Sequence, residues 1–113
     1  MNTLIAFYRR PEGGEEAYAA FERAYADGHL PLIAKVPGIR TIRVARVRRS
    51  LTPDSDIALV ARMAFGDRET LRTALASPEM QAAADNLAAI GGTKLATMLV
   101  VEEAEDLIPD GFR

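Results

Sequence analysis

The sequence predicts an α+β fold in which one four-stranded antiparallel sheet packs against helices. Three observations lead to this prediction. Hydrophobic residues make up 49% and charged residues 27% of the chain, the balance of a globular domain. The length of 113 residues fits one domain spanning residues 1–113. Along it, extended and helical patterns follow the order strand, helix, strand, strand, helix, strand.

The first strand and the first helix are separated by a turn. Residues 3–9 are a run of apolar, β-branched and aromatic side chains that stops at Pro-Glu-Gly-Gly, residues 11–14. After this turn, apolar residues recur at steps of three and four, at Tyr18, Phe21 and Tyr25, which indicates an amphipathic helix. Because Pro31 lacks a backbone donor, we expect this helix to kink or end near Leu30, with a short helical stretch over residues 31–35.

The middle of the chain predicts two strands joined by a polar turn. Residues 39–49 are rich in isoleucine and valine with interleaved arginines, and residues 57–65 are almost continuously apolar. Between them, residues 51–56 carry the Pro, Asp and Ser typical of turns.

A second helical region and a last strand follow. Asp67 is a good N-cap for a helix ending at Leu75. Ser77, followed by a proline and an acid, predicts the start of another helix that runs to about residue 90 and ends at Gly91-Gly92. Residues 94–102 predict the fourth strand, and an acidic tail comes after it.

This order of elements is the ferredoxin-like βαββαβ arrangement. Two helical regions cover one face of a four-stranded sheet, so the other face should be polar if it meets water. Residues of both parities in the last two strands are instead largely apolar. We therefore expect a homodimer in which the sheets of two copies pack face to face.

Charged residues gather in the second strand and after the fourth, the two expected edge strands. The arginines are Arg40, Arg43, Arg46, Arg48 and Arg49, and the acids are Glu102, Glu103, Glu105 and Asp106. Arginines protect an open edge, and a partner's acidic tail could cross them. For any single pair we favour solvated edge charges. The net charge of −2 argues against a nucleic-acid partner.

Missing residue types exclude several classes of site. The chain has no cysteine and one histidine, which excludes disulfides, thiolate nucleophiles, iron–sulfur clusters, cysteine zinc sites and multi-histidine metal sites. No Ser–His–Asp elbow or glycine-rich phosphate loop is present. We therefore expect no cofactor and no metal. With no export signal or membrane-spanning run, we expect a cytoplasmic protein without a membrane partner.

Four segments resemble a known family, the ethyl tert-butyl ether degradation (EthD) family. They are Ile-Ala-Phe-Tyr-Arg-Arg-Pro at residues 5–11, Tyr-Ala-Asp-Gly-His-Leu-Pro-Leu at 25–32, Lys-Val-Pro-Gly-Ile-Arg at 35–40 and Ala-Ser-Pro-Glu at 76–79. The resemblance implies a dimeric α+β barrel with a ligand cleft between helices and sheet. Relatives of that fold include lactone isomerases, polyketide cyclases, cofactor-free oxygenases and haem-degrading enzymes, so the fold does not fix the reaction.

His29 is the candidate catalytic residue. It follows Tyr25 by four positions, so it shares the inner face of the first helix, close to a helix end where carbonyls lack partners. One ring nitrogen bonded to a carbonyl and the other facing the cleft is the arrangement of an oriented general acid or base. The alternative is a histidine that only caps the broken helix.

The candidate substrate-binding residues are Phe7, Tyr25, Met63 and Phe65. This assignment takes the odd-numbered residues of the first and third strands to face the helices, because the larger side chains lie there; a one-residue slip in register would reverse it. Tyrosine hydroxyls such as that of Tyr25 could polarise a carbonyl, although such residues are more often core aromatics.

Three hypotheses for function remain open. The first is a cofactor-free enzyme of small-molecule metabolism, of isomerase, cyclase or oxygenase type, that acts on a small apolar or aromatic substrate. The alternative is a non-catalytic binding or accessory protein for a hydrophobic metabolite. The third is a purely structural partner of a larger enzyme system, which predicts that no sizeable cavity exists.

Overall fold

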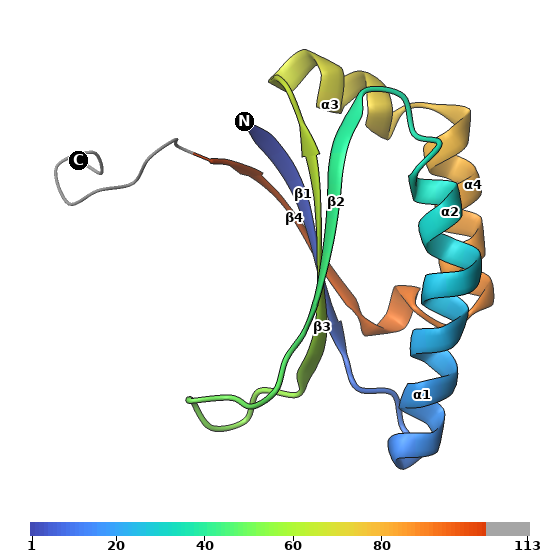
Figure 1. Cartoon of the computed structure of the whole chain (residues 1–113), viewed down its shortest axis with the longest axis vertical. Coiled ribbons are helices and arrows are strands. Elements are labelled where there is room, and N and C mark those ends of the chain that lie inside the picture. Colours follow the sequence, from blue (N-terminus) through green and yellow to red (C-terminus); the bar gives the residue numbers. More distant parts are fainter. Residues whose placement is uncertain (104–113) are drawn as a thin grey trace, which may run out of the picture.

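A single sheet with helices on one face makes up the computed structural model, which describes residues 1–103 (Figure 1). The strands are β1 (Asn2–Arg9), β2 (Ile39–Arg46), β3 (Ile57–Phe65) and β4 (Ala96–Glu102). Their order across the sheet is β2-β3-β1-β4, and each neighbouring pair is antiparallel. The ferredoxin-like fold class predicted from the sequence is confirmed, with β2 and β4 at the edges.

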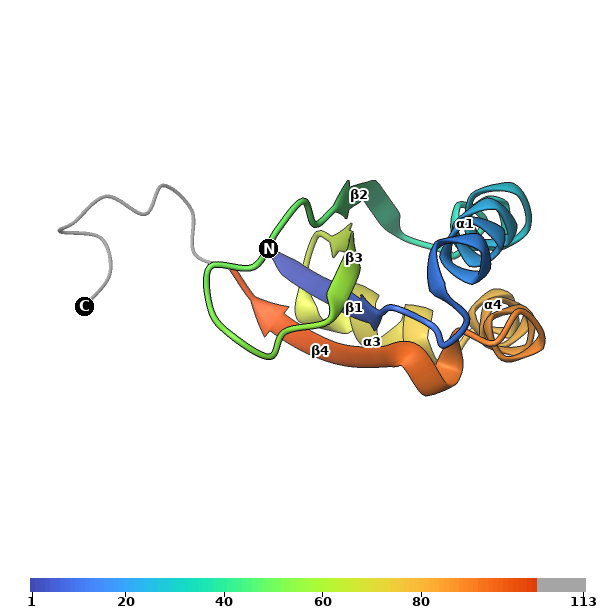
Figure 2. The same ribbon diagram turned by 90° about the horizontal axis from the view of Figure 1, so that it is seen from below.

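The helices lie on one side of the sheet, where α2 and the turn before it pack against α4 (Figures 1 and 2). They are α1 (Gly14–Ala24), α2 (Leu30–Ile33), α3 (Arg68–Leu75) and α4 (Pro78–Ala89). A π-helical turn, Tyr25–His29, joins α1 to α2, and a 3-10 turn, Thr93–Leu95, precedes β4. Within residues 1–103, no helix has both the length and the apolar character needed to cross a bilayer.

Both predicted N-caps of the second helical region are confirmed. Asp67 accepts a hydrogen bond from the backbone N–H of Thr70 at 2.7 Å, at the start of α3. Ser77 accepts one from the backbone N–H of Met80 at 3.1 Å and donates to the carbonyl of Ala74 at 2.7 Å. These bonds satisfy N–H groups that a helix leaves without partners at its start, so the sequence positions of both helices are well specified.

The disturbance predicted at Pro31 takes the form of a π turn rather than a break. The helix continues to Ile33, and the N–H of Leu30 bonds to the carbonyl of Tyr25, five residues back. Pro31 has no N–H to donate to the carbonyl four residues before it, and the wider turn lies immediately ahead of it. Tyr25 and His29, the first and last residues of this turn, are both buried.

Two strand ends differ from the sequence prediction by more than one residue. β2 ends at Arg46, three residues earlier than expected. The backbone N–H of Val47 donates a hydrogen bond to the carbonyl of Ala58, and the chain leaves the sheet after this bond. β4 begins at Ala96, two residues later than expected, because residues 93–95 form the 3-10 turn.

The face assignment is correct for β3 and wrong for β1. Directly opposed residues of antiparallel strands share a face. Leu4 pairs with Met63 and Tyr8 with Leu59, so the even-numbered residues of β1 join the odd-numbered residues of β3 in the core under the helices. Phe7 pairs with Val60 and therefore lies on the opposite face.

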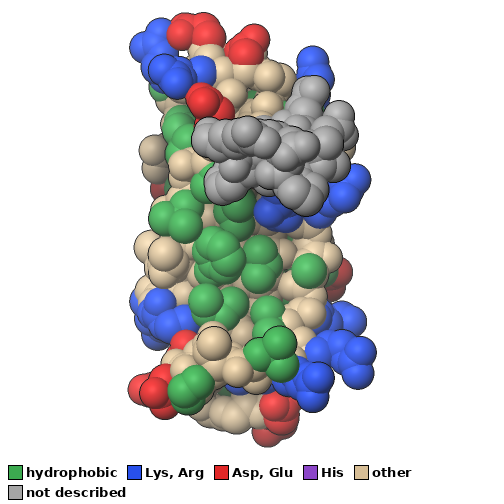
Figure 3. Space-filling view, turned by 90° about the vertical axis from the view of Figure 1, so that its left-hand side faces the viewer, with side chains coloured by type: hydrophobic (Ala, Val, Ile, Leu, Met, Phe, Trp, Pro, Cys, Tyr) green, Lys and Arg blue, Asp and Glu red, His purple; other side chains and the backbone are tan. Residues whose placement is uncertain are grey.

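The face away from the helices carries an apolar band. Its apolar side chains include Ile5, Phe7, Val60, Leu99 and Val101. Figure 3 shows hydrophobic side chains gathered down the middle of this face, with basic side chains at its margins. We call these five residues the open-face band. A band of this kind is unusual for a sheet surface that meets water.

The acidic residues at the end of β4 pair within the chain. Glu103 accepts hydrogen bonds from Arg62 and from the Thr3 hydroxyl, and Glu102 accepts one from Arg68 at 3.0 Å. On the other edge strand, Arg46 donates to Glu22 of α1. The remaining tail acids named above, Glu105 and Asp106, lie outside the described residues.

Candidate functional site

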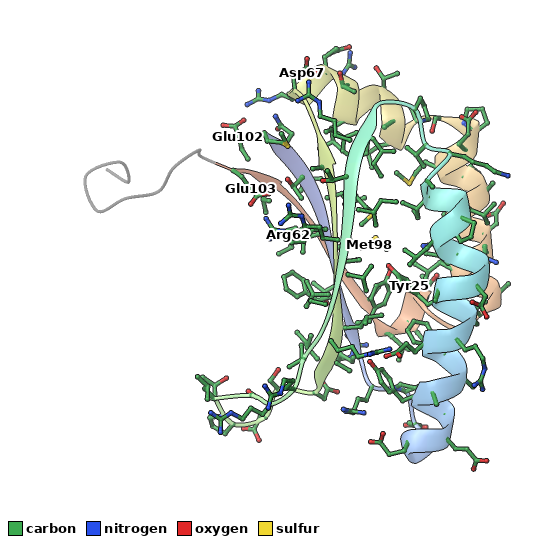
Figure 4. The ribbon with its side chains drawn as sticks, in the orientation of Figure 1. Tyr25, Arg62, Asp67, Met98, Glu102 and Glu103 are labelled. Atoms are coloured by element: carbon green, nitrogen blue, oxygen red, sulfur yellow. The ribbon has the colours of Figure 1, made fainter. Side chains whose placement is uncertain are left out.

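A cleft of about 420 Å³ lies between the sheet and helices α3 and α4. Its walls come from β1, β3 and β4 on one side and from α2, α3, α4 and the π turn on the other. In Figure 4, Met98 of β4 points from the sheet toward the helices, whereas Arg62 and Glu103 lie on the opposite side of the sheet. A cleft of this volume suits a small molecule.

Three of the four methionines in the chain line this cleft. They are Met63 of β3, Met80 of α4 and Met98 of β4. The fourth, Met1, is not part of the lining. Methionine is unbranched and polarizable, so it adapts to apolar and aromatic molecules of different outline. The other apolar walls are leucine, isoleucine, valine and alanine side chains.

The polar groups in the cleft are few and neutral in kind. Of the residues known to line it, Tyr8, His29 and Thr93 carry a side-chain oxygen or nitrogen, and none is an acid, a lysine or an arginine. A negatively charged ligand would therefore lose its hydration here without gaining a cationic partner. The cleft is suited to a neutral molecule.

His29 lies at the end of the π turn and is 3% exposed. Its Nδ1 is 3.3 Å from Oδ1 of Asn86 on α4. Burial lowers the pKa of His29, and the hydrogen bond to Asn86 offsets part of that effect. The imidazole is therefore neutral at pH 7, with a ring nitrogen available to accept a proton.

Tyr8 and Tyr25 extend from His29 as a row of aromatic rings. The ring centres of Tyr25 and His29 are 5.1 Å apart, and those of Tyr8 and Tyr25 are also 5.1 Å apart. Burial raises the pKa of both tyrosines, and the Tyr25 hydroxyl beside Tyr8 raises that of Tyr8 further. Both hydroxyls therefore stay protonated at neutral pH and can act as hydrogen-bond donors.

A second, broader depression of about 760 Å³ lies over β2 and α1. It is lined by Tyr25 and by the ion pair that Arg46 makes with Glu22 at 2.6 Å. We favour the smaller cleft as the functional site because it contains His29 and because its walls are predominantly apolar. Among residues 1–103, no group of three or more potential metal ligands comes together.

The predicted site residues separate into four places. His29 and Met63 lie together in the cleft. Tyr25 stands behind His29 and faces the second depression, and Phe65 is fully buried in the core without lining the cleft. Phe7 lies on the open face of the sheet, so its expected place under the helices was wrong. The catalytic and binding roles themselves stay predictions.

Sequence reasoning missed Asn86, Met80 and Met98. A signal for the first two exists in α4, where Met80, Ala83 and Leu87 recur at steps of three and four and line one side of the cleft. Asn86 follows Ala83 by three residues, so it borders the same face of the helix. Met98 needed the register of β4 against β1, which the pattern alone does not supply.

Comparison with known proteins gives a family and several related structures. The model of the EthD domain matches residues 15–89. An EthD family protein from Bacillus halodurans C-125 is 33% identical with a TM-score of 0.81, and the match covers 92% of this chain and 99% of that one. No functionally curated protein matches the sequence.

Two other solved structures share the fold at greater distance. A dimeric ferredoxin-like protein of unknown function from Jannaschia sp. CCS1 is 22% identical, with a TM-score of 0.62 over 91% of this chain and 100% of that one. SnoaB, a cofactor-independent oxygenase from Streptomyces nogalater, is 25% identical, with a TM-score of 0.58 over 96% of this chain and 95% of that one.

Proposed function

Because the chain belongs to the EthD family, we propose that it acts in small-molecule metabolism as a cofactor-free enzyme for a neutral apolar or aromatic substrate. The observation that carries this proposal is the composition of the cleft. The only histidine of the chain and three of its four methionines line one cavity, and no charged residue is among those known to line it. SnoaB, a cofactor-independent oxygenase, offers a precedent on a similar fold.

The chemistry that suits this cleft is proton transfer. A neutral His29 accepts a proton from an activated C–H or a phenolic O–H of the substrate, and the electron pair stays on the substrate as an enolate or phenolate. The hydroxyls of Tyr8 and Thr93 are the donors in the cleft that can stabilise the developing oxyanion. Isomerisation, cyclisation or reaction with dioxygen are the routes open to such an anion.

A non-catalytic binding protein is the second candidate. The observation that favours it is that His29 is the only group in the described lining whose ordinary pKa lies near neutrality. A reaction that needs a separate general acid beside this base therefore has no such group in the described lining. In this reading the cleft holds a hydrophobic metabolite, and His29 only accepts a hydrogen bond from it.

Binding of three matched bicyclic probes tests the chemistry of the cleft. We expect 2-naphthol to bind more tightly than naphthalene, because its hydroxyl can donate to His29. We expect 2-naphthoate to bind most weakly, because no described lining residue offsets its charge. Isothermal calorimetry gives the three affinities, and equal or tighter binding of 2-naphthoate would overturn the proposed preference for neutral ligands.

Deuterium exchange separates the enzyme from the binding protein. The probe is 2-tetralone, a neutral apolar ketone with an activated C–H next to its carbonyl. For the enzyme we expect exchange in D₂O, followed by proton NMR, to be accelerated by about 100-fold or more, and to fall to background in His29→Gln. Binding of 2-tetralone without acceleration supports the binding protein. If the protein neither binds 2-tetralone nor accelerates its exchange, both candidate functions are rejected.

The assembly that fits the sheet is a homodimer. The open-face band exposes apolar side chains on a face that no described helix covers, and Leu99 within it is 48% exposed. A second copy packed on this band would remove it from water and leave both clefts on the outer sides. The Jannaschia protein, described as dimeric, offers a precedent on a similar fold.

A further inference from the structure

The side chain of Asn86 joins α4 to the π turn that carries His29. Its Oδ1 lies 3.3 Å from Nδ1 of His29. Its Nδ2 lies above the neighbouring Gly28, where a Cβ would be 3.8 Å away. Asn86 thus contacts His29 directly and lies close to the preceding residue of the turn. No other side-chain hydrogen bond to His29 is found among the described residues.

The polarity of this contact decides which nitrogen of His29 carries the proton. An amide oxygen only accepts hydrogen bonds, so Nδ1 must be the donor. In the neutral ring the other nitrogen, Nε2, then carries the lone pair. In free histidine the opposite tautomer, with the proton on Nε2, is the preferred one. The contact therefore selects the less common tautomer.

We propose that Asn86 is a positioning residue that holds neutral His29 as the Nδ1–H tautomer, so that Nε2 is the proton acceptor in the cleft. This inference rests on the proposed function, which gives His29 its role. Asn86 does not touch the reacting atoms in this account. It acts by fixing the orientation and the tautomer of the ring.

An amide suits this role better than a carboxylate would. A carboxylate in the same place would favour the charged imidazolium, which cannot accept a proton. An amide orients the ring without adding a charge, so burial keeps His29 neutral. The titratable groups that face His29 from the elements around it are Tyr25 of its own turn and Tyr8 of β1, and both are protonated at neutral pH.

Nitrogen NMR of the imidazole tests the proposal directly. Because the chain has one histidine, a ¹⁵N-labelled sample gives one pair of ring-nitrogen signals that belong to His29. Above the pKa of His29 we expect Nδ1 to show the shift of a protonated nitrogen and Nε2 that of an unprotonated one. A wild-type ring protonated on Nε2 would overturn the proposal.

Two substitutions at position 86 have different expected effects. Asn86→Leu removes the acceptor, so we expect the signals to move toward the Nε2–H tautomer. Asn86→Asp keeps an acceptor, so the Nδ1–H tautomer should remain while the pKa of His29 rises by about one unit or more. Asp85→Asn, an exposed neighbour on α4, is the control and should change neither.

The outcomes separate this proposal from the proposed function. The tautomer can be as expected while the wild-type protein does not accelerate exchange of 2-tetralone. In that case the proposed enzymatic function is rejected, and the proposal that His29 carries its proton on Nδ1 is supported. If exchange is accelerated, Asn86→Leu should lower its kcat by at least tenfold and leave the affinity for naphthalene unchanged. An unchanged tautomer in folded Asn86→Leu protein, together with an unchanged His29 pKa in Asn86→Asp, contradicts the proposal.

Discussion

The burial of His29 predicts that the protein loses stability as the pH falls below about 6.5, the ordinary pKa of histidine. The folded state lowers the pKa of His29, so the unfolded chain binds this proton more readily than the folded chain does. The contribution of His29 to stability is therefore largest above the unfolded pKa and decreases as the pH falls toward the folded pKa. His29→Gln removes this titration and should lack that part of the pH dependence.

The size of the effect follows from linkage. Between the two pKa values the folded and unfolded states differ by one proton, which gives a slope of at most about 1.4 kcal/mol per pH unit in the free energy of unfolding. Below the folded pKa both states are protonated and the slope returns to zero. The pKa values of Glu22, Asp67 and Glu103 are also lowered in the folded protein, so these carboxyls change the free energy of unfolding at a more acidic pH than His29 does. Those carboxyls are present in both proteins, so their effect cancels in the difference.

Urea unfolding from pH 8 to pH 5 measures this difference. Wild type and His29→Gln are compared at one fixed protein concentration, because association also contributes to stability. We expect the free-energy difference between them to shift against the wild type as the pH falls below 6.5. A difference that does not change with pH, or that favours the wild type at low pH, would refute the buried, neutral His29.

Three further predictions concern the sheet face, the helix cap and two turns. Leu99→Lys should convert a dimer into monomers in sedimentation velocity, whereas Val100→Lys, its neighbour on the helix side of β4, should leave the dimer intact; equal effects would contradict packing through the open-face band. Ser77→Ala should cost about 1–2 kcal/mol in urea unfolding, because it removes the N-cap of α4, and a cost near zero would show that the cap is dispensable. Gly91→Ala should lower the free energy of unfolding by about 1–2 kcal/mol, because of its positive φ alone. Gly38→Ala should lower it by more, because its Cβ would also lie 2.3 Å from Cγ2 of Thr70. Equal losses of stability in thermal unfolding would contradict this.

Local signals in the sequence were sufficient to predict the order of the elements. Asp67 and Ser77 each cap a helix by accepting a hydrogen bond from the backbone N–H three residues further on. A short sequence pattern is therefore sufficient to predict where each of these helices begins. The effect of Pro31 was also local, but its form was not predictable. Whether a helix breaks or widens there depends on what the turn packs against, and here the π turn buries both Tyr25 and His29.

Features that depend on pairing between distant segments were not predictable in the same way. The face on which Phe7 lies follows from its opposition to Val60, and a one-residue difference in register reverses it. The contact between His29 and Asn86 joins residues 57 positions apart in the chain. Met63 and His29 were identified as site residues because each lies on the buried face of its own element, but their neighbours in the cleft come from α4 and β4.

The central claim is that the His29 cleft binds a neutral apolar molecule, and the methionine methyl groups test it most directly. In protein labelled with ¹³C at the methionine methyls, the four signals come from Met63, Met80 and Met98 in the cleft and from Met1 outside it. On titration with 2-naphthol we predict that the first three shift together with one saturation curve and that Met1 does not shift. Saturable binding that leaves the three cleft methyls unmoved would contradict the account.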